Sequence, residues 1–306
     1  MAVLNKRAIV TAIEMYGVTA IRLGRTLNPS LDALIKALFI TGEQGFFYDP
    51  NDLSTMYQDA AGTAPVTGVG QPVGLVLDKS KGLTLSAELA TNGDFTNGSV
   101  GWTLANSASV TSGALVLSNQ YATADQAHNV LNGDLVELSY SIVEVSGTPA
   151  LFVSGSSYAG SARALNSSLG THKVRFRVSD ATKSLRLVQN NTNVTLKLDN
   201  VSVKKVQGNH TYQPTSASRP ILQDTPRSID FDAVDDKLIT NLPAQLTGCT
   251  VIRSVPGVGV QLLTNQTIPA TYEDNKDHCG LIVINRALTP SETSAIAAEF
   301  NKRAGV

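Results

Sequence analysis

Residues 172–178 read His-Lys-Val-Arg-Phe-Arg-Val, with apolar residues at 174, 176 and 178 and basic residues at 173, 175 and 177. Side chains of a β-strand point alternately to opposite faces, so this stretch predicts a strand with one buried and one solvated face. Similar stretches, separated by turn residues, predict further strands around it. These cover residues 114–117, 135–142, 150–153, 184–188 and 194–203. The pattern from about residue 83 to 206 predicts a sandwich or jelly roll, long enough to bury its own core.

Helical patterns lie outside this block. Apolar residues at 31, 34, 35, 38 and 39 form one stripe at helical spacing, with Asn28 or Ser30 as the predicted cap. A weaker helix is predicted over residues 6–16. Near the C-terminus, Thr289-Pro-Ser-Glu292 predicts a capping box that opens a helix ending at Gly305.

The composition excludes several classes of protein. Only 16% of the 306 residues are charged and the net charge is -1, so no basic surface for nucleic acid is indicated. The chain is too apolar for a disordered protein, and it has no apolar run long enough for membrane insertion. Glu14 interrupts the apolar start, which argues against a signal peptide and predicts synthesis in a cytoplasm. Two cysteines, Cys249 and Cys279, cannot form a disulfide framework, and whether they pair is left open.

The middle block resembles the carbohydrate-binding, galactose-binding-like jelly rolls. Asn92-Gly-Asp-Phe95 with Gly101-Trp102 resembles the opening of such modules, and Leu198-Asp-Asn-Val-Ser-Val203 resembles their close. The resemblance covers about 40% of the chain and implies the fold more strongly than a ligand. It also implies a structural calcium ion with Asp199 as a ligand, although Thr96 stands where the family frequently has Glu.

Glycan binding by this jelly roll would require exposed aromatic side chains. Trp102 is predicted to pack inside the sandwich, so Tyr121 and Tyr158 are the better candidates for a sugar platform. An ordinary surface or edge position is the simpler explanation of either tyrosine. Arg163 is a further candidate for ligand binding, because with other arginines it is expected on one face of the jelly roll. Alternation also explains these arginines as a face exposed to solvent.

The flanking segments resemble the concanavalin-like, laminin-G-like sandwiches. In such domains one continuous turn carries a motif that is here divided between Leu77-Asp-Lys-Ser80 and Gly208-Asn-His210. The resemblance therefore implies a jelly roll inserted into a turn, which exposed turns tolerate. The expected fold is mainly β: a jelly-roll sandwich within a second, abbreviated β-sandwich-like domain, with short N-terminal helices and a C-terminal helix. The expected domains are a helical anchoring or oligomerisation segment (1–45), a discontinuous laminin-G-like domain (46–82 plus 207–306) and the inserted jelly roll (83–206).

No constellation of residues predicts catalysis. The acidic residues at 230, 232, 235 and 236 invite a metal or glycosidase interpretation, but we expect them to form a turn. Asp277-His278-Cys279 is not expected to form a nucleophilic pair, because adjacent strand residues point to opposite faces. The chain is therefore predicted not to be an enzyme and to need no cofactor beyond the calcium ion above.

Two segments resemble structural proteins of tailed bacteriophages and prophages: residues 45–67, which begin Gly-Phe-Phe-Tyr-Asp-Pro, and residues 217–222. The resemblance implies a virion protein of the tail or fibre region that displays the jelly roll for adhesion to host-surface glycans. Its partners would be sister copies in a homotrimer and other virion proteins bound through the N-terminal segment. Two alternatives remain: a capsid decoration or head-fibre protein, and a glycan-binding accessory module of a polysaccharide-active enzyme.

Overall fold

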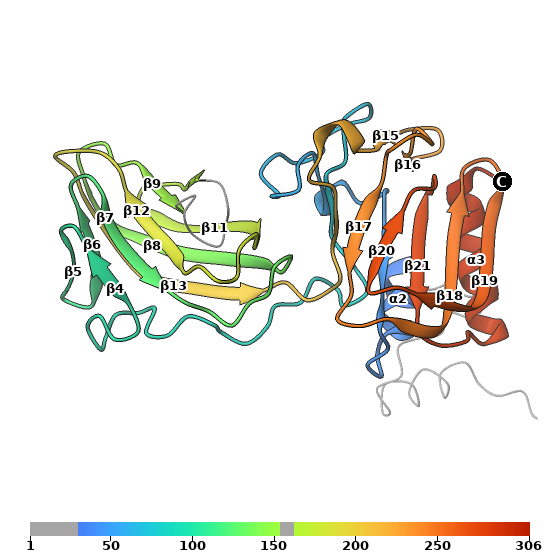
Figure 1. The fold of residues 1–306 in the computed structure, drawn as a ribbon, viewed down its shortest axis with the longest axis horizontal. Helices are drawn as coiled ribbons and strands as arrows, with labels where there is room; N and C mark the ends of the chain where they lie inside the picture. Colours follow the sequence, from blue (N-terminus) through green and yellow to red (C-terminus); the bar gives the residue numbers. More distant parts are fainter. Residues whose placement is uncertain (1–29, 154–161) are drawn as a thin grey trace, which may run out of the picture.

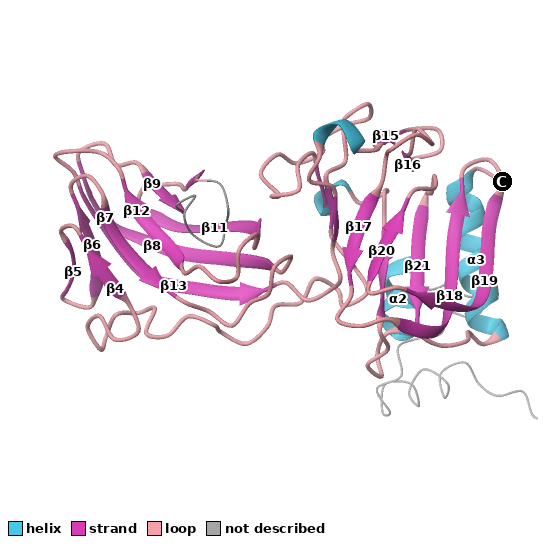
Figure 2. Cartoon of the chain, viewed as in Figure 1, coloured by secondary structure: helices cyan, strands magenta, loops and turns pink. Residues whose placement is uncertain are grey.

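The computed structural model describes residues 30–153 and 162–306, and the protein is mainly β, which confirms the predicted fold class. Two lobes lie side by side (Figure 1). Within the described residues, we call 83–153 with 162–206 the inserted lobe, and 30–82 with 207–306 the outer lobe. The described helices all belong to the outer lobe, whereas strands fill both lobes (Figure 2).

The inserted lobe consists of two antiparallel five-stranded sheets. The first, called the β7 sheet, has the order β10 (Arg163–Ala164), β9 (Leu151–Val153), β12 (Leu185–Gln189), β7 (Ala122–Gln126) and β4 (Thr103–Ala105). The second, the β8 sheet, has the order β11 (Gly170–Arg177), β8 (Leu135–Ser146), β13 (Thr195–Lys205), β6 (Ala114–Ser118) and β5 (Ala108–Thr111). Phe176 of β11 is buried in the single core between them, as its alternation predicts.

The opening and closing motifs of the inserted lobe meet at Gly93. The carbonyl of Gly93 accepts a hydrogen bond of 2.8 Å from the amide of Val201. A Cβ atom on Gly93 would lie 1.8 Å from the Val201 carbonyl oxygen, so only glycine allows this approach. Trp102 is 6% exposed and its indole N–H donates to the Thr91 carbonyl at 3.1 Å, which confirms its predicted packing role.

The outer lobe also holds two larger sheets. One, the β21 sheet, has the order β1 (Gly45–Tyr48), β21 (Gly280–Ile284), β18 (Leu246–Val255) and β19 (Gly259–Ile268). The other has the order β2 (Met56–Tyr57), β3 (Leu75–Val76), β14 (Thr211–Tyr212), β17 (Leu238–Asn241) and β20 (Thr271–Asp274), beside the hairpin of β15 (Ile221–Gln223) and β16 (Ser228–Asp230). Both sheets therefore combine strands from before and after the inserted lobe. The domain was expected to be abbreviated, and its interval between Asp236 and Leu281 contains four strands, β17 to β20.

Two α-helices cover one face of the β21 sheet. Helix α2 (Leu31–Leu38) begins at Ser30, whose side chain accepts from the Ala33 amide, so Ser30 is the cap. Helix α3 (Pro290–Ala304) begins with the predicted capping box, because Thr289 and Glu292 each accept from the other's backbone amide. The apolar sides of both helices pack against Phe47 and the β21 strand. The helix predicted over residues 6–16 lies outside the described residues.

The two halves of the divided turn come together at the base of the inserted lobe. Asp78 is buried, and its carboxylate accepts hydrogen bonds from the amides of Phe47, Ser80 and Asn209. Nδ1 of His210 accepts a hydrogen bond of 3.0 Å from the Asp78 amide. The proton of the neutral ring is therefore on Nε2, which donates to the Val206 carbonyl. The segments that enter and leave the inserted lobe pair with each other, since Gln207 donates to the Thr84 carbonyl at 2.8 Å.

The lobes also pack directly against each other. Leu75 and Leu77 of the outer lobe form a small buried cluster with Leu135 and Val206. Cys249 and Cys279, left open by the sequence, are both buried and free. In residues 30–153 and 162–306, no helix has the length and apolarity needed to cross a bilayer.

Candidate functional site

The outer face of the β7 sheet carries an apolar row that crosses the strands. Strand register places Phe152 opposite Val188, and Val188 opposite Thr123. Ala164 extends the row on one side and Ala105 on the other. Phe152 is partly exposed, whereas Leu151 and Val153 beside it are buried in the core. A partly exposed aromatic ring on a sheet face is a surface on which a sugar ring can stack.

A charged row lies two residues further along the same strands and therefore on the same face. Arg186 donates to Asp125 through Nε at 2.7 Å and through Nη2 at 3.0 Å. This bidentate contact with Asp125 raises the pKa of Arg186. The pair borders a hollow of about 310 Å³ whose other walls are Thr103, Thr182, Lys183 and Ser184. Such a fixed pair offers hydrogen-bonding groups to hydroxyls beside the apolar row.

Of the two tyrosine candidates, only Tyr121 lies within the described residues. Tyr121 is 56% exposed and precedes β7, and its amide donates to the Gln189 carbonyl at 2.8 Å. Its backbone therefore lies at the end of the β7 sheet, two residues before Thr123 of the apolar row. Tyr158 lies outside the described residues. A role for Tyr121 in binding stays a prediction.

Arg163 lies on the opposite side of the β7 sheet from Phe152. It pairs with Val153, in the row that faces the core, at the edge strand β10. Its guanidinium donates to the Arg175 carbonyl of the β8 sheet and, at 3.4 Å, to the Gly62 carbonyl of the outer lobe. The structure thus separates Arg163 from the outer face and uses it to link two sheets and two lobes.

Asp199 lies in an irregular part of β13 where the register with β8 shifts. Its carboxylate accepts the amide of Asn200 at 2.7 Å. Thr96, at the position of the family's frequent Glu, donates its hydroxyl to Asp94 at 3.1 Å. Calcium prefers six to eight oxygen ligands, and a calcium ion at Asp199 stays a prediction.

Asp232, Asp235 and Asp236 of the acidic cluster form a turn, as expected, whereas Asp230 ends strand β16. One carboxylate oxygen of Asp232 accepts the amides of Val234, Asp235 and Asp236. Asp232, Asp235 and Asp236 bring carboxylate oxygens within 4.8 Å of one another; among the described residues they are the only such group of three. Asp232 and Asp236 accept hydrogen bonds from backbone amides of the turn, and Asp235 accepts the Ser218 hydroxyl, so the turn accounts for the grouping.

The Asp277-His278-Cys279 run does not assemble a nucleophile. Nε2 of the buried His278 lies 3.0 Å from Asp274, which also pairs with Arg253 at 2.7 Å. Asp277 instead accepts the amide of Phe231. Burial raises the pKa of the Cys279 thiol, which disfavours the thiolate that nucleophilic attack requires.

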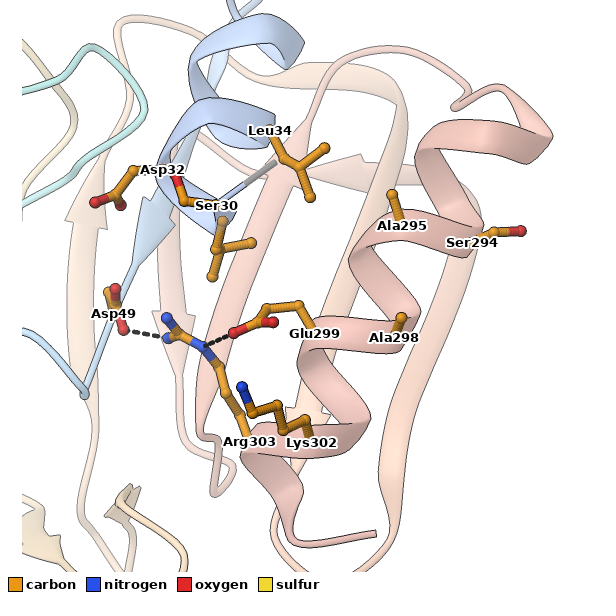
Figure 3. Close-up of a pocket in the computed structure, with 11 residues that line it drawn as sticks. Ser30, Asp32, Leu34, Asp49, Ser294, Ala295, Ala298, Glu299, Lys302 and Arg303 are labelled. Atoms are coloured by element: carbon orange, nitrogen blue, oxygen red, sulfur yellow. Dashed lines mark hydrogen bonds and ion pairs between the residues drawn. The ribbon is translucent and has the colours of Figure 1, made fainter. Parts of the chain in front are cut away.

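A larger hollow of about 810 Å³ lies between α2 and α3 (Figure 3). Apart from Lys302, its charged groups are paired: Arg303 contacts Asp49 and Glu299, as Figure 3 shows. Lys79 beside it contacts Asp32 at 3.0 Å and Asp49 at 3.2 Å. These contacts hold the two helices to the β21 sheet.

Sequence reasoning missed the residues that make the outer face of the β7 sheet. The outward direction of Phe152 could be predicted from period-two alternation, because Leu151 and Val153 on either side point into the core. The position of Asp125 in a strand could not be predicted, because the sequence of β7, Ala-Thr-Ala-Asp-Gln, has few residues with strand preference. Its pairing with Arg186 depends on register between strands about 60 residues apart.

No protein-family model and no curated protein matches this chain. Among solved structures, the chain is similar to a mutant of CBM29-2, a family 29 carbohydrate-binding module studied for its mechanism of ligand recognition. The two chains share 17% identity with a TM-score of 0.21, over 39% of this chain and 89% of that one.

Proposed function

We propose that the chain is a glycan-binding protein that holds saccharides on the outer face of the β7 sheet. The observation that carries the proposal is the partly exposed Phe152 in an apolar row next to the bidentate Arg186–Asp125 pair. Phe152 stacks on the apolar face of a sugar ring, and the ion pair exchanges hydrogen bonds with its hydroxyls. Asp125 is engaged on both oxygens by Arg186, so it supports binding rather than proton transfer.

Phe152→Ala tests this proposal. Loss of the ring removes the stacking surface, and we expect affinity for the best glycan found on an array of host polysaccharides to fall about tenfold, since 1.4 kcal/mol is a factor of ten. Val143→Ala is the matched control, because Val143 is 50% exposed on β8 and lies on the other sheet. Equal loss in both variants, or no binding to any glycan by the unaltered chain, would contradict the proposal.

We propose further that the chain performs this role as an oligomeric virion protein of a phage tail or fibre, made in the host cytoplasm. The resemblance of residues 45–67 and 217–222 supports the phage context. Strand β19 supports self-association, because it is the edge of the β21 sheet and exposes Leu262 and Leu263. Light scattering of the recombinant chain should give a trimer mass, and a monomer mass would argue against this role. Antibody labelling of virions distinguishes the tail from a head-fibre position.

A further inference from the structure

A second hollow lies between the two lobes, away from the outer face of the β7 sheet. This inter-lobe cleft has a volume of about 470 Å³. The inserted lobe supplies Asn132, Gly133 and Lys205 to its walls, and the outer lobe supplies Lys81, Tyr212 and Asn241. Val206, which belongs to the small buried cluster between the lobes, also lines it, so packed apolar side chains support the cleft.

Arg177 lies beside two residues that line the cleft, Tyr212 and Gly133, and forms no ion pair with another described residue. Its guanidinium carbon lies 3.4 Å from the centroid of the Tyr212 ring, across the lobe boundary. Its Nε is buried, and among the described residues it has no hydrogen-bond partner. A partly buried guanidinium without a carboxylate partner is costly, and an anion beside it would offset that cost.

Nitrogen donors converge beside Gly133, at the wall of the cleft. A Cβ atom on Gly133 would lie 3.6 Å from Nη2 of Arg177 and 3.9 Å from Nδ2 of Asn241. Gly133 has a φ of +96°, a conformation that side chains disfavour, so the space next to these donors stays open. Asn241 donates one amide hydrogen to the Tyr212 hydroxyl at 3.1 Å, which orients the group and leaves a second hydrogen for a ligand.

The charges around the cleft favour an anion. Lys205 pairs with Asp134 at 2.8 Å, whereas the ammonium of Lys81 donates to the Glu43 carbonyl at 2.7 Å. Two cations, Lys81 and Lys205, line the cleft with the single carboxylate of Asp134, and Arg177 lies beside it, so positive charge predominates at the wall. The buried Asp78 carboxylate lies outside the lining of the cleft, and both of its oxygens already accept hydrogen bonds from backbone and hydroxyl donors.

We propose that the inter-lobe cleft binds the anionic group of an acidic saccharide, a carboxylate or a sulfate, with Arg177 and Asn241 donating to its oxygens. The saccharide part of this inference rests on the proposed function, whereas the anion part rests on the cleft alone. A ligand held here contacts both lobes and fixes their relative position. The outer face of the β7 sheet then binds neutral sugar rings while the cleft selects for charge.

Titration calorimetry of the full chain tests the proposal, with tetragalacturonate, its methyl ester, a sulfated cello-oligosaccharide and inorganic phosphate as probes. We expect tetragalacturonate or the sulfated sugar to bind, and the methyl ester to bind at least tenfold more weakly than tetragalacturonate. Phosphate binding as tightly as either acidic sugar would identify a free anion as the ligand and overturn the saccharide assignment. Absence of binding by every anionic probe would overturn the whole proposal.

Variants locate the site. Arg177→Gln should weaken binding of the acidic probe at least tenfold, and Arg177→Lys should restore part of it. Asn241→Asp keeps the side-chain shape at an exposed position and should also weaken binding tenfold through repulsion, which keeps the test valid if Arg177→Gln unfolds the chain. Phe152→Ala should weaken neutral-glycan binding about tenfold, as above, whereas Val143→Ala, on the other sheet, should leave acidic-probe binding unchanged. Unchanged affinity in Asn241→Asp and in a folded Arg177→Gln would overturn the site assignment.

Discussion

At the scale of single residues, the buried histidine of the divided turn has the clearest consequence for pH. Burial lowers the pKa of His210 to about 4, below the usual value of 6.5. The unfolded chain therefore binds a proton between pH 6.5 and 4 that the folded chain excludes. This residue's contribution to stability is full above pH 6.5 and is lost as the pH falls toward 4. Burial of Asp78, next to His210, raises the pKa of that carboxyl to about 6 and acts in the opposite direction over the same range.

His210→Gln separates the two effects, because Asp78 is present in both proteins. The advantage of the unaltered chain over His210→Gln in unfolding free energy should shrink by up to about 3 kcal/mol from pH 7 to pH 4. Urea unfolding followed by circular dichroism at several pH values measures this difference. Parallel pH profiles of the two proteins would contradict the assignment of His210 as a buried neutral group.

Residue-level patterns were informative where the structure depends on near neighbours. Alternation predicted β11, the capping box predicted α3, and Trp102 is buried as its motif indicated. The inter-lobe cleft was not predictable in this way. Gly133, Arg177 and Asn241 span more than a hundred residues, and only strand register and lobe packing bring their donors together.

At the scale of elements, pairing between segments far apart in sequence decides the architecture. Strand β1 pairs with β21 across more than 230 residues, with Gly45 opposite Ile284. Composition cannot reveal such a partner, because any buried antiparallel strand of similar length satisfies the same pattern. The divided turn is the exception, because the resemblance of its halves to one motif implied the contact between residues 77–80 and 208–210. At Gly93 the structure adds a tight approach to Val201 that no sequence pattern had predicted.

Gly93→Ala tests that approach. An added Cβ meets the Val201 carbonyl oxygen at 1.8 Å, so the opening motif must move away from β13. We expect the inserted lobe to lose about 3 kcal/mol of unfolding free energy, at the upper end for overpacking. Fluorescence of Trp102, the single tryptophan of the chain, reports this lobe during urea unfolding. Gly68→Ala is the matched control because no atom lies within 4 Å of its added Cβ, and equal stability of both variants would contradict the argument.

At the scale of the whole molecule, the outer lobe has its own core, and the chain enters and leaves the inserted lobe at one place, the divided turn. The Asp78 carboxylate and the Asn209 amide are joined at 2.7 Å, and Thr84 meets Gln207 in the connecting segments. Removal of residues 83–206, with a Gly-Ser linker of about four residues between Gly82 and Gln207, should therefore leave the outer lobe folded. Near-UV circular dichroism from its tyrosines should keep a native signal and a cooperative thermal transition.

The melting temperature of this shortened chain should nevertheless fall. Leu75 and Leu77 lose their cover from Leu135, and burial of one such side chain contributes about 1.5–3 kcal/mol. Leu135→Ala in the full chain is the matched control, since it removes much of the same contact while both lobes remain. A shortened chain without a cooperative transition would show that the outer lobe depends on the inserted lobe for its fold, and that the insertion is more than a module carried on a turn.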